Sequence, residues 1–149
     1  MKKVWIGGVA ATLLLAGCEK ARLDEEVRRL CEKDGGIKVY ETVRLPPEKF
    51  DKFGVVSIPI KEKTKPGDEY FYEWDIQYLK KGNPEMWRDH FRVIRVRDTK
   101  VLGEAIGYSR RGGDLPGPWH DSSFACPDGA DITILKKRIF SHSDWRGGK

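Results

Sequence analysis

The clearest alternation of apolar and polar positions in the chain runs from residue 69 to residue 80. One side of this segment, when extended, carries only large apolar side chains: Tyr70, Tyr72, Trp74, Ile76 and Tyr78. A period of two is typical of a strand with one buried face. We therefore expect this stripe to face the helices as the centre of the core, so that Trp74→Ala unfolds the domain. The alternative is an exposed aromatic platform for a carbohydrate or another ligand.

Shorter runs of alternating or β-branched residues predict the remaining strands, at residues 37–43, 55–60, 90–97 and 101–108. The last two are separated only by Asp98-Thr99-Lys100, which predicts an antiparallel hairpin with Gly103 at a possible bulge. Residues 110–127 are rich in glycine and proline and predict a long ordered loop.

Helical spacing appears at both ends of the segment that follows the first 17 residues. Apolar residues recur in steps of three and four from residue 19 to residue 33, and Asp34-Gly35-Gly36 then provides a stop. Residues 130–141 show the same spacing, with Asp128 or Asp131 available as the N-cap, although a final strand is the alternative there. The order of these elements predicts an α+β fold. We expect an antiparallel sheet of about four to five strands, with an N-terminal and a C-terminal helix packed on one face.

The N-terminus has the order of a secretory signal, because Lys2 and Lys3 precede an uncharged run over residues 4–16. That run is shorter than the ~20 residues of a membrane span. It ends in Leu15-Ala16-Gly17-Cys18, which resembles the lipobox of bacterial lipoproteins. The resemblance implies that the Cys18 thiol receives a diacylglycerol, that residues 1–17 are removed, and that residues 18–149 form a single periplasmic domain. A plain secretory signal with a chance cysteine, or a buried helix, is the alternative.

The same resemblance predicts an address in the cell envelope. Acylated Cys18 would hold the chain on the periplasmic side of a bilayer. Glu19 stands where an aspartate would signal retention in the inner membrane, so the outer membrane is favoured over the inner. Loss of Lys2 and Lys3 lowers the formal charge from +5 to +3, which argues against a nucleic-acid partner for a protein outside the cytoplasm.

Once Cys18 carries lipid, only Cys31 and Cys126 remain. Two cysteines in an exported domain predict a structural disulfide, which would close a loop of about 95 residues. Two free buried thiols, or a redox-active pair, are the alternatives.

Few residues suggest catalysis, a metal or another cofactor, and we expect none of these. His90, His120 and His142 lack the spacing of a metal site. Arg110 and Arg111 precede two glycines and, with His120, are candidate contacts for an anion or a partner; the alternative is a solvated turn.

Two stretches, CEKDGGIKVYETVRLPPEKF and YSRRGGDLPGPWHDSSFACP, together resemble small uncharacterised lipoproteins of Gram-negative bacteria. The resemblance implies the same anchored class and brings no activity with it. The sequence therefore favours a non-enzymatic binding or structural module of the envelope, whose partner is an envelope protein or the cell wall. The alternative is an envelope enzyme acting on a wall or lipid substrate, with residues 110–127 at its site.

Overall fold

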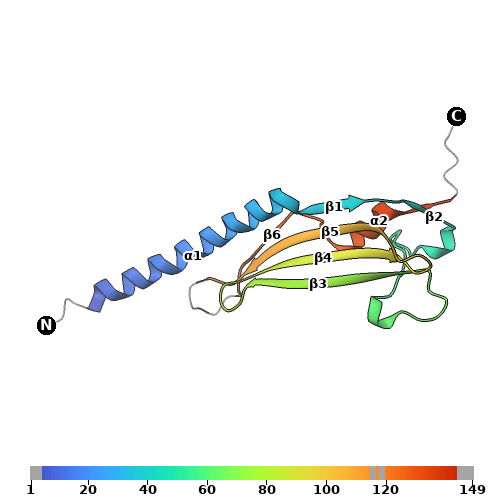
Figure 1. The fold of residues 1–149 in the computed structure, drawn as a ribbon. Helices are drawn as coiled ribbons and strands as arrows, with labels where there is room; N and C mark the ends of the chain where they lie inside the picture. The colour runs from blue at the N-terminus through green and yellow to red at the C-terminus, as the bar shows by residue number, and fades with distance from the viewer. Residues whose placement is uncertain (1–4, 115–116, 118–119, 144–149) are drawn as a thin grey trace, which may run out of the picture.

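The computed structural model describes residues 5–114, 117 and 120–143, with the backbone alone for residues 5–17. It contains a long N-terminal helix, α1 (Trp5–Asp34), a five-stranded antiparallel sheet, and a short C-terminal helix, α2 (Ile132–Ile139). The α+β class, the antiparallel sheet and the helix at each end are confirmed. In Figure 1 the beginning of α1 projects beyond the ends of the strands, while its C-terminal part lies along the sheet.

Three long strands form the body of the sheet: β3 (Tyr70–Lys80), β4 (Glu85–Arg95) and β5 (Lys100–Arg111). They pair in the order β5-β4-β3, and two short strands, β1 (Gly36–Val39) and β6 (Ser123–Cys126), share the outer edge of β5. The predicted hairpin over residues 90–108 is confirmed, and its register shifts between Val93 and Ile94, opposite Gly103. The bulge that Gly103 suggested is therefore present.

Several boundaries differ from the sequence prediction. The segment predicted as one strand at 37–43 is split, and its end belongs to β2 (Val43–Leu45), which pairs in parallel with β7 (Phe140–His142). Residues 55–60 form only isolated bridges, and two short 3-10 turns, η1 (Pro47–Lys49) and η2 (Lys61–Lys63), flank them. The predicted loop at 110–127 contains β6, and positions 115, 116, 118 and 119 of it lie outside the described residues. Asp131 caps α2 as predicted, since its carboxylate accepts from the backbone N–H groups of Thr133 and Ile134.

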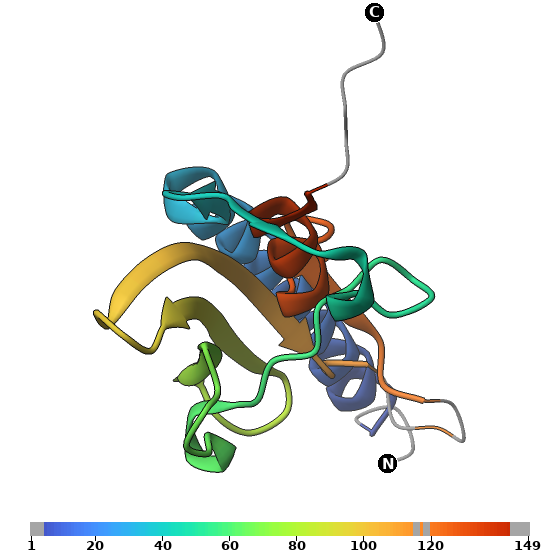
Figure 2. The same ribbon diagram turned by 90° about the vertical axis from the view of Figure 1, so that its right-hand side faces the viewer.

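The two helices lie on opposite faces of the sheet, which corrects the expectation of a shared face. Ile106 and Tyr108 of β5 pack with Leu23 and Val27 of α1. Ala105, which precedes Ile106 and so points to the other side, packs with α2. Figure 2 shows α2 between the curved sheet and the chain that follows β2, a chain that adds Leu45, Val56 and Ile58 to the same core.

A disulfide joins the end of α1 to β6. Cys31 and Cys126 are bonded, with their Cα atoms 5.9 Å apart across a separation of 95 residues, so the predicted pair is confirmed. Because Cys126 lies opposite Tyr108 in the β5–β6 register, the bond lies on the face that α1 covers. The link therefore fixes the C-terminal end of α1 on this face.

A close approach at Gly103 yields a test of the α2 face. A methyl group there would lie 2.8 Å from the Lys38 carbonyl oxygen and 3.0 Å from the Ile139 side chain. We expect Gly103→Ala to lower the free energy of unfolding by about 1 to 3 kcal/mol, because the crowded atoms include backbone. Gly107→Ala is the matched control on the same strand and face, since its nearest atoms lie 3.6 Å away or more. Equal urea midpoints for the two variants would contradict this packing.

Candidate functional site

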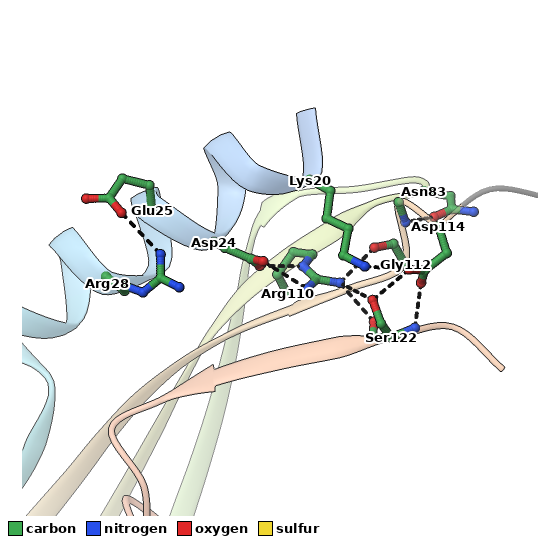
Figure 3. A network of polar contacts seen from close by, with 10 residues as sticks. Lys20, Asp24, Glu25, Arg28, Asn83, Arg110, Gly112, Asp114 and Ser122 are labelled. Atoms are coloured by element: carbon green, nitrogen blue, oxygen red, sulfur yellow. Dashed lines mark hydrogen bonds and ion pairs between the residues drawn. The ribbon is translucent and has the colours of Figure 1, made fainter. Parts of the chain in front are cut away.

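The buried side chain of Arg110 holds α1 against β5. It is 2% exposed, and all three guanidinium nitrogens have partners within the chain (Figure 3). Nε and Nη2 donate to the Asp24 carboxylate at 2.7 and 3.3 Å, and Nη1 donates to the carbonyls of Gly112 and Ser122 and to the Ser122 hydroxyl. This geometry leaves the guanidinium no free face for an anion, so the structure places Arg110 inside the fold rather than at a partner surface.

A second set of polar contacts ties the first turn after Cys18 to the domain. The Asp114 carboxylate accepts from Lys20 Nζ at 2.6 Å and from the backbone N–H and hydroxyl of Ser122. At the β3–β4 hairpin, Lys80 Nζ lies 3.4 Å from Glu19 Oε1. The segment directly after Cys18 therefore packs on the domain and is not a free stalk.

The remaining sequence-predicted residues are not gathered into one site. Cys18 is exposed and unbonded, on α1. Arg111 is exposed at the end of β5, and His120 is exposed in the segment between β5 and β6. Among the described residues, no group of three histidine, cysteine or acidic side chains is arranged to hold a metal ion. No helix in the described part of the chain is long and apolar enough to cross a membrane.

A hollow of about 550 Å³ lies at the far end of the sheet from Cys18, beside the start of β3 and the end of β4. Its lining residues come from three segments, 41–44, 68–70 and 95–97. Arg95, one of the lining residues, forms ion pairs with Glu41 and with Asp98, and its Nη2 lies 2.7 Å from Asp98 Oδ2. These ion pairs occupy the charged groups of Arg95 and Glu41 and hold the strand ends together.

The exposed side chains of β3 form the most distinctive surface of the domain. Trp74, Ile76 and Tyr78 are 48%, 39% and 49% exposed, so the expectation that the whole stripe forms the core is wrong for these three residues. Tyr70 and Tyr72 do pack on the core. The reason is length: α2, with eight residues, spans about 12 Å, whereas β3, with eleven, spans about 37 Å. The helix covers only one end of this face.

One carboxylate forms hydrogen bonds with two of the indole rings on this face of the sheet. Asp89 of β4 accepts hydrogen bonds from the indole N–H groups of both Trp74 and Trp87, each at 2.9 Å. The Trp74 ring is stacked on Phe91 with centroids 5.6 Å apart, and Tyr78 packs beside Trp87. We call this set the aromatic surface: Trp74, Ile76, Tyr78, Trp87, Asp89 and Phe91. Both indoles are held by hydrogen bonds, with Trp74 exposed and Trp87 partly buried, and contiguous exposed apolar patches often mark interaction sites.

The pattern of alternating aromatic residues was present in the sequence, and a ligand platform was the alternative that it left open. The Asp89 contact had no sequence signal, because it depends on the register that places Ile76 opposite Asp89. No protein-family model matches the chain, and no curated protein or solved structure was found to be similar to it.

The Arg110 contacts predict a large loss of stability when the guanidinium is removed. We expect Arg110→Ala to lower the free energy of unfolding by about 3 to 5 kcal/mol, because Asp24 would keep a poorly hydrated charge. Arg111→Ala, the adjacent exposed arginine, is the control and should change it by less than about 0.5 kcal/mol. Denaturant unfolding of both variants measures the difference. A small effect at Arg110 would contradict its role in holding α1 against β5.

The Asp114 contacts predict acid sensitivity. The hydrogen bond from Lys20, followed by those from Ser122, lowers the pKa of Asp114 from 3.8 to about 2. A carboxyl group whose pKa is lower in the folded than in the unfolded protein stabilises the fold at any pH above the unfolded-state pKa. This stabilisation is lost as the pH falls through the folded-state pKa. We therefore expect unfolding to become easier between about pH 4 and pH 2. Asp114→Asn should be less stable at neutral pH and show a flatter dependence in this window. An Asp114 carboxyl that titrates near pH 4 by NMR would contradict the prediction.

Proposed function

We propose that this chain is a lipoprotein, anchored through acylated Cys18 on the periplasmic side of an envelope membrane, whose domain at 18–149 is a non-enzymatic binding module. The observation that carries the anchor is the order of residues 2–18, in which lysines, an uncharged run and Leu-Ala-Gly precede the cysteine. The outer membrane is favoured, since Glu19 follows Cys18.

The contacts of α1 support this arrangement. Cys18 is exposed, and the residues just after it contact the β3–β4 hairpin and the loop after β5. Acyl chains on Cys18 would thus hold this end of the domain close to the bilayer without a flexible linker. The aromatic surface, on the opposite face of the sheet from α1, would remain accessible to a protein partner or the cell wall.

The binding role is favoured over an envelope enzyme by the state of the candidate polar groups. An enzyme at residues 110–127 needs free acid–base or anion-binding side chains around a pocket. Arg110 and Asp114 instead use their polar atoms to hold α1 and the loop together. Among the described residues of this loop, these two are part of the structural framework.

The anchor is tested by the cysteine itself. We expect Cys18→Ser to abolish incorporation of radiolabelled palmitate and to leave an uncleaved precursor, because the serine hydroxyl does not replace the thiol in thioether formation. The matched control is the double variant Cys31→Ser, Cys126→Ser, which removes the other two cysteines and should still incorporate the label. Persistent labelling of the Cys18 variant would contradict the proposal.

A further inference from the structure

The outer edge of β3 is largely unpaired. Its inner edge pairs with β4 along the whole strand. On the outer edge, among the described residues, only an isolated parallel bridge between Ile60 and Tyr72 is present, with Tyr72 N–H donating to the Pro59 carbonyl at 3.0 Å. The chain then enters η2, which still contacts β3 through the Lys61–Glu73 ion pair, but among the described residues no backbone hydrogen bond reaches this edge after Tyr72.

The direction of the Tyr72 N–H shows which backbone groups this edge exposes. In an antiparallel pair, successive residues alternate between bonding to the partner strand and pointing away from it. Tyr72 points outward, and the β3–β4 register is unbroken up to Tyr78. Trp74, Ile76 and Tyr78 therefore also direct their N–H and C=O groups outward. The three residues that expose their side chains thus also expose their unpaired backbone groups.

Proteins usually protect such an edge with proline, a bulge, a covering loop or charges. Between Glu73 and Tyr78 there is no proline, and the register shift comes only after Tyr78. The charged residues Glu73 and Asp75 lie on the face opposite the aromatic surface. Glu73 is paired with Lys61 and Arg92, at 2.6 and 2.7 Å, whereas Asp75 is exposed and makes no ion pair within the described chain.

We propose that this edge binds an extended segment of a partner protein as an additional strand of the sheet. The backbone groups of Trp74, Ile76 and Tyr78 would bond to that segment, and its alternate side chains would lie against the aromatic surface. The partner segment would place apolar side chains against the aromatic surface. Its intervening side chains would include a basic residue opposite Asp75, which has no ion pair among the described residues. This inference rests on the proposed binding role and deepens it, and the choice of a partner protein over a second copy rests on the Cys18 anchor.

A second copy of the chain fits the edge less well. Antiparallel pairing of two β3 strands would point the two β3–β4 hairpins, and with them the two Cys18 ends, in opposite directions. Two lipid anchors in one bilayer require both Cys18 ends on the same side of the pair, which this arrangement does not provide. A partner segment without its own fixed anchor has no such restriction.

Amide hydrogen exchange separates strand addition from binding to the face alone. The probe is a synthetic peptide of about seven residues that alternates valine and lysine, added to the isotopically labelled full chain in detergent micelles. We expect the amides of Trp74, Ile76 and Tyr78 to exchange rapidly in the free protein and on the order of tenfold more slowly with peptide. A block peptide of equal composition should give no protection. Protection of these amides in the free protein, through self-association, would overturn the proposal.

Methylated peptides and two variants at one position complete the test. Methylation of the peptide nitrogens that face β3 should abolish binding, whereas methylation of the alternate nitrogens should not. Ile76→Pro removes one outward N–H and should weaken binding by about tenfold, clearly more than Ile76→Val, which keeps the N–H and only shortens the side chain by one methylene. Equal binding of all these peptides would overturn strand addition. So would a change in tryptophan fluorescence with cell-wall glycan or anionic vesicles when the peptide gives no amide protection. Failure here leaves the palmitate result unaffected, so the two proposals fail separately.

Discussion

The attachment of α1 to one face of β5 is the constraint on which the rest of the domain depends. Arg110 and Asp24 form a buried ion pair at one end of the contact, and the Cys31–Cys126 disulfide fixes the other end. Between them, Val27 and Tyr108 belong to a continuous apolar cluster. Because consecutive residues of a strand point to opposite faces, this contact leaves only the other face of β5 for α2.

Two helices on opposite faces cover the sheet incompletely. The helix α1 covers the end of one face near the β3–β4 hairpin, and α2 with the chain after β2 covers the far end of the other. The half of the second face that remains carries the aromatic surface. Large rings there need a rigid frame to stay ordered in water, and the shared hydrogen bonds of Asp89 with Trp74 and Trp87 provide it.

The same incomplete coverage explains why β3 combines an open edge with exposed aromatic side chains. Among the described residues, the backbone of the chain before β3 bonds to its edge only at Tyr72, through Pro59 and Ile60. A protein that binds a partner through this strand needs both features together, since backbone bonds provide affinity and side-chain contacts provide selectivity. The polar groups near residues 110–122 serve a different purpose, because they hold the Cys18 end of α1 in a fixed position.

The sequence by itself determined the local elements and one long-range link. Periodicity of two identified β3 and the hairpin of β4 and β5, helical spacing and Asp131 identified α2, and the cysteine count identified the disulfide. It also supplied the hypothesis of an anchor at Cys18. Only the tertiary structure decided which face each helix covers, which half of the aromatic stripe is buried, and that Arg110 lies inside the fold. These outcomes depend on the register and the length of elements that are distant in the chain. The pattern of residues in one segment contains no information about how much of that segment another element will cover.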